Sequence, residues 1–132
     1  MNIKGGKTMC RKIVIAGGRD FDDFEGMSKI LDKIDWGPED EIVSGTADGA
    51  DTLGERYALV NEIKVKKFPA KWNQFGRKAG FLRNEEMARY CTGGIVFWDG
   101  KSKGSRSMIY LLNKESKPCK VVKYKVINKE DK

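Results

Sequence analysis

The sequence lacks histidine altogether, and among its 132 residues it holds only three prolines and three cysteines. Imidazole is the commonest metal ligand and general base, so we expect neither a metal site nor a mechanism that uses a histidine. The cysteines Cys10, Cys91 and Cys119 are odd in number, lie far apart and form no CxxC pair. This pattern is typical of reduced thiols in a cytoplasmic protein.

Long hydrophobic runs are also missing. No apolar stretch approaches the roughly 18–20 residues that cross a bilayer, and the N-terminal "MNIKGGKTM" has no apolar core of a secretory signal. We therefore expect a cytoplasmic protein with no membrane partner. The hydrophobic share of 39% and the aromatic share of 10% suit a globular protein with one hydrophobic core.

The formal net charge of +7 comes from the two ends of the chain. Residues 1–12 hold four basic side chains and no acid, and residues 114–132 hold seven lysines against three acids. The body between them is nearly neutral, so a nucleic-acid surface on the body is the less favoured interpretation. We predict one domain over residues 10–127, with an N-terminal tail over 1–9 and a charged C-terminal tail over 128–132.

The hydrophobic pattern alternates between short continuous runs and helical spacing. Strands are predicted over 12–17, 40–45, 64–69, 93–99 and 120–127. Helices are predicted over 22–34 and 50–63, then up to residue 90 or 91 after a polar and aromatic loop over 70–81, and over 105–115. This order predicts an α/β fold, a Rossmann-like three-layer sandwich with a five-stranded, mainly parallel sheet.

Glycine-rich loops follow the first four predicted strands, where an open parallel sheet binds its ligands. The first loop, "GGRD" (17–20), offers glycines for close approach, an arginine for phosphate and Asp20 as a helix cap. The second, "SGTADGAD" (44–51), has the composition of an anion-binding nest of amides, with Asp48 or Asp51 as the cap. The alternative for both loops is that they only make a turn and cap a helix.

Two further features complete the candidate site. Arg83, Asn84 and Glu85 are predicted to open a helix, where an arginine opposes the helix dipole; the alternative is a surface arginine paired with Glu55 or Glu86. Aromatic side chains near the loops could stack on a base or simply cover the core. They are Trp72 and Phe75 in the predicted loop and Trp98 at a strand end.

Taken together, "GGRDF", "SGTADGAD", "WNQFGRKAGFLRNEEM" and "FWDGKSKGS" resemble the YspA/YpsA-related branch of the SLOG superfamily. That superfamily also contains the LOG phosphoribohydrolases and the Smf/DprA single-strand DNA-binding proteins. The resemblance covers about residues 11–123 and implies a Rossmann-like fold with a pocket for a nucleotide. It implies that Arg83 corresponds to the arginine of LOG enzymes, and that the loop from Asp99 to Ser105 corresponds to their phosphate-binding loop.

The sequence departs from these relatives at important positions. Met108 stands where LOG enzymes have a catalytic glutamate, and glycosidic cleavage requires a carboxylate. The candidates to replace it are Asp99, Asp51 and Glu85, with Asp20 as a further one. Thr46 and Asp48 interrupt a loop that usually resembles "SGGARGAD", which could change the ligand that fits.

The leading hypothesis is a sensor or regulator that binds a nucleotide-derived ligand, either ADP-ribose/NAD-like or a nucleoside monophosphate. The alternatives are a nucleotide N-glycosidase or phosphoribohydrolase, and single-strand nucleic-acid binding resembling DprA. No cofactor is firmly implied, the expected partner is a nucleotide-like small molecule, and a homodimer is left open. The predicted ligand-binding residues are Gly17, Gly18, Arg19, Asp20, Ser44, Gly45, Thr46, Gly49, Asp51, Trp72, Arg83, Asn84, Trp98, Asp99, Gly100, Ser102, Gly104 and Ser105.

Overall fold

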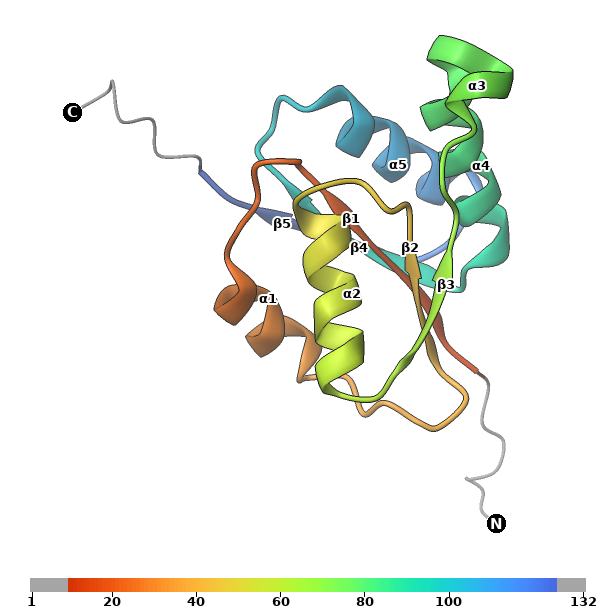
Figure 1. The fold of residues 1–132 in the computed structure, drawn as a ribbon. Coiled ribbons are helices and arrows are strands. Elements are labelled where there is room, and N and C mark those ends of the chain that lie inside the picture. Colours follow the sequence, from red (N-terminus) through yellow and green to blue (C-terminus); the bar gives the residue numbers. More distant parts are fainter. Residues whose placement is uncertain (1–9, 126–132) are drawn as a thin grey trace, which may run out of the picture.

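A five-stranded parallel sheet forms the centre of the computed structural model, which describes residues 10–125 (Figure 1). The strands are β1 (Lys12–Gly17), β2 (Glu41–Ser44), β3 (Lys64–Lys67), β4 (Gly93–Trp98) and β5 (Cys119–Lys123). Their order across the sheet is β3-β2-β1-β4-β5, and every neighbouring pair is parallel. The predicted fold class is confirmed. The strand order reverses beside β1, and such a switch point is where open α/β sheets bind ligands.

Helices cover both faces of this sheet. The longer ones are α1 (Phe24–Leu31), α2 (Ala50–Val60), α4 (Ala79–Tyr90) and α5 (Lys103–Lys114), and a short helix α3 (Trp72–Phe75) with a 3-10 turn η1 (Gly76–Lys78) precedes α4. Helices α1 and α2 pack on one face, and α4 and α5 on the other. Each connection between consecutive strands contains at least one helix, as a crossover between parallel strands requires.

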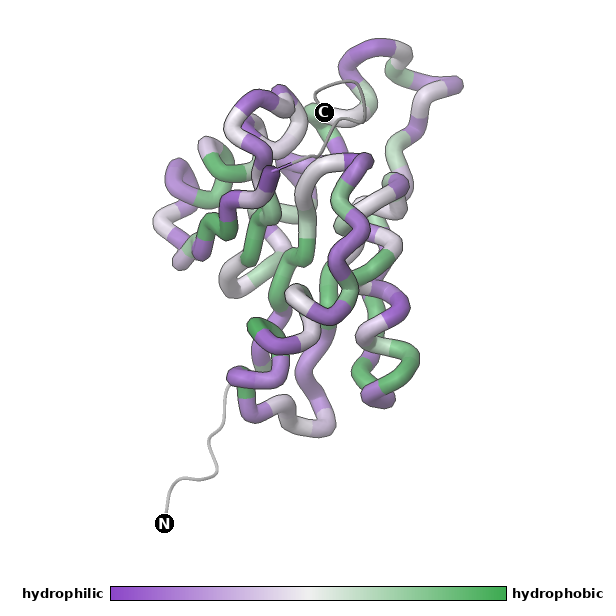
Figure 2. The backbone as a smooth tube through the Cα atoms, turned by 90° about the vertical axis from the view of Figure 1, so that its left-hand side faces the viewer, coloured by the Kyte–Doolittle hydropathy of each residue, from purple (hydrophilic) through white to green (hydrophobic). Residues whose placement is uncertain are grey.

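Two hydrophobic clusters, one on each face of the sheet, make up the core. One contains Ile15, Ile42 and Phe97 of the sheet with residues of α1 and α2, and the other contains Val14 and Val96 with residues of α4 and α5. Adjacent residues of β1 thus point to opposite clusters, which explains why this strand is a continuous apolar run. Figure 2 shows hydrophobic residues gathered along the inner strands, with hydrophilic segments outside.

Several predicted boundaries are wrong. Helix α4 begins at Ala79, so Arg83 lies in its second turn, and the inferred conflict with the helix dipole does not exist. Trp72 and Phe75 belong to α3 rather than to a loop. Helix α5 begins at Lys103, two residues before the predicted start. Strand β5 ends at Lys123; residues 126–127 of the predicted strand and domain, and the predicted tails 1–9 and 128–132, lie outside the described residues.

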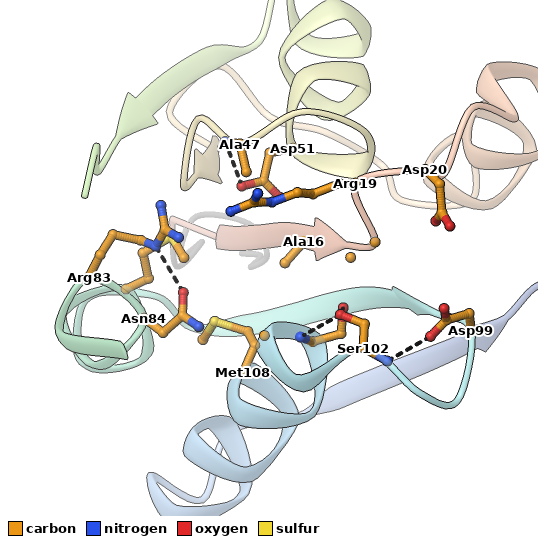
Figure 3. Close-up of a pocket in the computed structure, with 15 residues that line it drawn as sticks. Ala16, Arg19, Asp20, Ala47, Asp51, Arg83, Asn84, Asp99, Ser102 and Met108 are labelled. Atoms are coloured by element: carbon orange, nitrogen blue, oxygen red, sulfur yellow. Dashed lines mark hydrogen bonds between the residues drawn. The ribbon is translucent and has the colours of Figure 1, made fainter. Parts of the chain in front are cut away.

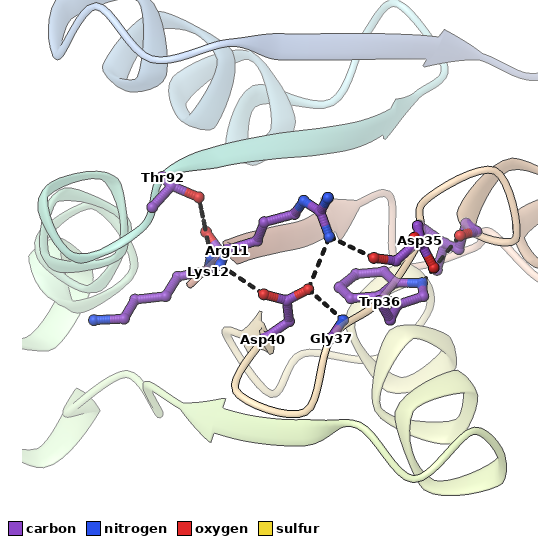
Figure 4. Close-up of polar contacts among 8 residues, drawn as sticks. Arg11, Lys12, Asp35, Trp36, Gly37, Asp40 and Thr92 are labelled. Carbon is purple, nitrogen blue, oxygen red and sulfur yellow. Dashed lines mark hydrogen bonds and ion pairs between the residues drawn. The ribbon is translucent and has the colours of Figure 1, made fainter. Parts of the chain in front are cut away.

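A cluster of polar contacts surrounds the amino end of β1, at the end of the sheet opposite the carboxyl ends of the strands (Figure 4). The buried carboxylate of Asp40 accepts hydrogen bonds from the backbone and Nη1 of Arg11, at 2.8 and 2.9 Å, and from the Gly37 amide at 2.7 Å. Burial works to raise the pKa of Asp40, but these amides and the guanidinium outweigh it and lower the pKa. Within residues 10–125, no helix is both long and apolar enough to cross a membrane.

Candidate functional site

A cavity of about 440 Å³ opens at the carboxyl ends of β1 and β4 (Figure 3). The buried side chains of Ala16, Met87 and Met108 line it together with polar groups from the surrounding loops. Its volume falls in the roughly 300–1,000 Å³ range of small-molecule sites. The position and size of the cavity therefore match a ligand site at the switch point of the sheet.

Glycines of the first two loops lie close to other parts of the protein. A Cβ atom on Gly17 would lie 2.3 Å from the carbonyl oxygen of Phe97, and one on Gly18 would lie 1.9 Å from the hydroxyl of Tyr124. One on Gly49 would lie 2.2 Å from the Gly18 carbonyl oxygen. Close contacts within the protein therefore account for glycine at Gly17 and Gly49, with no ligand needed to explain it.

Neither of the expected aspartate caps forms. The N-cap of α1 is Asp23, which accepts from the Gly26 amide at 2.9 Å, whereas Asp20 accepts from the Tyr124 hydroxyl at 2.6 Å. The N-cap of α2 is Gly49, which has no side chain to accept a capping hydrogen bond. The amide of Ala50, at the start of α2, donates to the Gly18 carbonyl at 3.2 Å. The beginnings of α1 and α2 are therefore already bound by protein groups.

The second loop folds around the carboxylate of Asp51. Asp51 is 5% exposed, lines the cavity and accepts from the Ala47 amide at 3.1 Å through Oδ2. Burial raises the pKa of Asp51 to about 6, although the amides of Ala47 and Gly45 and the charge of Arg83 act to lower it. The amides predicted to form an anion nest for a ligand thus face the protein's own carboxylate. Thr46, in the same loop, has a left-handed φ of 65°.

Two arginines, Arg19 and Arg83, line the cavity from different elements. Arg83 is half-buried on α4; its Nη1 donates to the Gly45 carbonyl and its Nε to Asn84 Oδ1 at 2.9 Å. Among the described residues, neither Glu55 nor Glu86, the partners of the alternative interpretation, forms an ion pair with Arg83. Burial lowers the pKa of Arg83, Asp51 acts to raise it, and the nearby positive charge of Arg19 lowers it further.

Arg19 is exposed on the first loop and extends toward Asp51 and Arg83 (Figure 3). Within the part of the chain that the structure describes, no hydrogen bond or ion pair binds its guanidinium. Like charges repel unless an anion lies between them. Asp51 is the buried carboxylate beside the two arginines, and within residues 10–125 the guanidinium of Arg19 still has its donors free for a phosphate.

The start of α5 forms the opposite wall. Asp99 Oδ1 accepts from the amides of Lys101 and Ser102, both at 2.8 Å, and these bonds lower the pKa of Asp99. Ser102 caps the helix by accepting from the Ser105 amide at 3.4 Å. A Cβ atom on Gly104 would meet nothing within 4 Å. Gly104 is thus a glycine at the cavity that the fold does not require.

A second cavity of about 370 Å³ adjoins the first. Arg19, Ala47 and Arg83 line both cavities, and Thr46, Asp48, Pro69, Ala70 and Trp72 line the second but not the first. Trp72 is 51% exposed. Trp98 lies elsewhere: its Nε1 donates to the Ser102 carbonyl at 3.0 Å, and its ring faces Arg106 and Lys123.

The predicted residues are thus distributed over several places. The first cavity is lined by Gly17, Gly18, Arg19, Asp20, Asp51, Arg83, Asn84, Asp99, Ser102, Gly104 and Ser105. The second is lined by Arg19, Gly45, Thr46, Trp72 and Arg83. Neither is lined by Ser44, Gly49, Trp98 or Gly100, and the catalytic candidate Glu85 lines a third cavity.

Sequence reasoning missed the apolar and small residues of the site. Ala16 and Met87 line the first cavity, Pro69 and Ala70 the second, and Ala47 both. Ala16, just before the glycine that ends a predicted strand, is at the right edge of the sheet, so its place in the chain was a usable signal. Met87 is identified only once the register of α4 is known.

A parallel sheet with helices on both faces and a switch point beside β1 defines the class: a Rossmann-like α/β domain. Residues 11–75 match the model of the YAcAr family, described as the YspA, cpYpsA-related SLOG family. The resemblance inferred from the sequence is confirmed by this match. The matched range ends at α3, so it includes the first two loops but neither Arg83 nor the loop before α5.

Among solved structures, the chain is similar to DNA processing protein A (DprA) from Streptococcus pneumoniae, with a TM-score of 0.70 and 20% sequence identity. The similarity covers 91% of this chain and 52% of that one, so the chain spans about half the length of DprA. At this identity the comparison establishes a common fold. A comparison with curated proteins gives no match.

Proposed function

We propose that the protein binds a nucleotide or a nucleotide-derived ligand at the carboxyl ends of β1 and β4, as a sensor or regulator. The observation that supports this most directly is the pair of guanidiniums, Arg19 and Arg83, that line one cavity. The phosphate lies between them and the first amides of α5, beside Gly104. The family match and the likeness to the DprA fold support a nucleotide- or nucleic-acid-related role.

Binding without cleavage is supported by Met108. This side chain is 1% exposed and lines the first cavity, at the position where the resemblance to LOG enzymes places a catalytic glutamate. A thioether has no proton to exchange and no charge to stabilise an oxocarbenium ion. The cavity is therefore apolar at the position where those enzymes have their acid.

A thermal-shift panel of nucleoside monophosphates, ADP-ribose, NAD and ribose 5-phosphate tests the proposal. A ligand at about 100 times its Kd adds roughly 2.7 kcal/mol to the free energy of unfolding. The matched variants are Arg19→Gln, which removes a guanidinium without a protein partner in the described residues, and Arg89→Gln. Arg89 lies in the last turn of α4, its side chain is 64% exposed, and it lines neither of the two cavities. The shift should disappear in Arg19→Gln and persist in Arg89→Gln; no shift with any compound would refute the proposal.

Gly104→Ala separates ligand binding from folding. Alanine favours a helix over glycine by about 1 kcal/mol, and the added methyl group meets no protein atom within 4 Å. The variant should therefore be at least as stable as the wild type but bind the ligand more weakly. Unchanged affinity would place the phosphate away from the start of α5.

Hydrolysis of an N-glycosidic bond is a second candidate function, favoured by Asp51. Of the four carboxylates considered, this one is buried, faces the cavity and has a pKa raised to about 6, near the range of a general base. In such a reaction Asp51 takes a proton from water, the water oxygen bonds to C1′, and the base leaves with the electrons of the C1′–N bond. The base then takes up the proton from Asp51, which becomes a carboxylate again. Incubation with nucleoside monophosphates should then release free base in the wild type and not in Asp51→Asn. No released base would exclude this activity for those substrates.

A further inference from the structure

The second cavity continues the first past the two arginines. Arg19, Ala47 and Arg83 line both, so a group held by the guanidiniums has a cavity on either side. A ligand with an anionic centre and two neutral parts fits this arrangement. ADP-ribose has such a shape, because its phosphates lie between an adenosine and a second ribose. A nucleoside monophosphate has its sugar and base together on one side of the phosphate and would fill only one of the two cavities beyond the arginines.

The two cavities differ in the side chains that they offer. Among the described residues, the first has no aromatic side chain in its lining, but it has the hydroxyls of Ser102 and Ser105, the amide of Asn84 and the carboxylate of Asp51. Such groups suit the hydroxyls of a sugar. The second has Trp72 with Pro69 and Ala70, and the polar groups of Thr46 and Asp48. Apolar and aromatic surfaces suit the face of a base.

Trp72 is placed to take part in binding. Its indole lies against Gly80 of α4: a Cβ atom on Gly80 would lie 3.4 Å from Cη2 of Trp72 and 3.9 Å from Nη2 of Arg83. The indole and the guanidinium are therefore neighbours on one side of α4. Trp72 is about half exposed, and in residues 10–125 no aromatic ring or cation is stacked on its indole. Trp98, by contrast, is bound to Ser102 and faces two cations.

We propose that the second cavity is the base-binding half of the site, where Trp72 stacks on the base of a nucleotide whose phosphate is held by Arg19 and Arg83. The sugar that joins this base to the phosphate lies on the same side of the arginines as the base. The hydroxyl and carboxylate groups of the first cavity suit a second sugar on the other side of the phosphate, as in ADP-ribose. This assignment rests on the proposed function, but it concerns a different part of the ligand. It makes Trp72 the residue that distinguishes a nucleotide from a sugar phosphate.

Isothermal titration with four nucleoside monophosphates and with ribose 5-phosphate tests the assignment. The wild type should bind at least one nucleotide more tightly than ribose 5-phosphate. Removing a stacking side chain typically costs 1–3 kcal/mol, so Trp72→Ala should weaken nucleotide binding by about 5–150-fold. The affinity for ribose 5-phosphate should not change, because that compound has no base.

Phe75→Ala is the matched control. Phe75 is the other exposed aromatic residue of α3, 42% exposed, but it lines the third cavity. This variant should keep the wild-type affinities, as should the conservative Trp72→Phe to within a few fold. Circular dichroism of each variant checks that the fold is retained.

Four results would overturn the assignment. Trp72→Ala could leave nucleotide affinity unchanged, could weaken ribose 5-phosphate equally, or could have no more effect than Phe75→Ala. The wild type could also bind ribose 5-phosphate as tightly as every nucleotide, which would leave the phosphate site in place but remove the base site. Failure of all five compounds to bind would instead refute the proposed function together with this assignment.

Discussion

The buried carboxylate of Asp51 makes a specific prediction for stability. Its pKa is raised from the ordinary value of 3.8 to about 6 because the side chain is buried in the cavity wall. The folded protein therefore retains this proton up to about pH 6, whereas the unfolded chain releases it near pH 4. Between these values the folded state binds more protons, so the stabilising contribution is present below about pH 4 and is lost as the pH rises to about 6.

The expected magnitude follows from the shift. About two pKa units at 1.36 kcal/mol each give roughly 3 kcal/mol, which is the cost at neutral pH of keeping Asp51 ionised in the fold. Asp51→Asn is close in shape and can still accept from the Ala47 amide, but it carries no charge. The variant should therefore be more stable than the wild type by up to about 3 kcal/mol near pH 7, with the difference shrinking toward about pH 4.

Urea unfolding followed by circular dichroism, at a series of pH values, measures this difference. Asp48→Asn is the control, because it removes an exposed carboxylate from the same loop. Effects of other titrating groups, such as Asp40, appear equally in all three proteins and cancel in the comparison. A gap between Asp51→Asn and the wild type that does not change with pH, or a variant less stable than the wild type near pH 7, would refute the reasoning.

Three further substitutions test the loops and the opposite edge by urea unfolding. Asp40→Asn weakens three hydrogen bonds to a buried carboxylate and should lower the free energy of unfolding by about 1–3 kcal/mol; because the pKa of Asp40 is lowered, this loss should shrink below about pH 4. Thr46→Gly removes a branched side chain from a residue with a left-handed φ of 65° and should raise the free energy of unfolding by about 1 kcal/mol. Gly49→Ala places a Cβ atom 2.2 Å from the Gly18 carbonyl oxygen, at a residue with a φ of 80°, and should lower the free energy of unfolding by about 1–3 kcal/mol. A change of opposite sign in any of them would contradict the corresponding local geometry.

The sheet could be predicted from the sequence because its central strands are buried on both faces. β1 and β4 are continuous apolar runs ended by a glycine loop and by "WDG", and such runs separated by helical spacing leave few alternatives to a parallel sheet. The start of α4 could not be predicted in this way. Residues 70–81 contain two glycines and no helical repeat of apolar residues, and the structure places α3, η1 and the first turn of α4 there.

The composition of the loops indicated a site but not the function of each residue. Glycine is needed equally where a ligand approaches and where two loops pack, and only the surroundings of each Cβ position distinguish Gly104 from Gly17 and Gly49. The sequence also contains both the amides of the second loop and the acid Asp51. It does not show that the acid folds back onto those amides, because that contact depends on how α2 starts.

The two candidate tryptophans illustrate the same limit. Trp72 and Trp98 both stand beside glycine-containing loops, and composition gives no reason to prefer either. Their environments differ because Trp98 has a hydrogen-bond acceptor in Ser102 four residues further on, whereas Trp72 lies on the open side of Gly80. Tertiary contacts therefore decide which ring is available to a ligand.

The central claim is that one phosphate lies between Arg19 and Arg83, and a crystal structure of the protein with a saturating nucleoside monophosphate tests it most directly. We expect the phosphate oxygens within hydrogen-bond distance of both guanidiniums, beside Gly104 at the start of α5. A phosphate bound at any other place, or an empty cavity at saturating nucleotide, would contradict the claim.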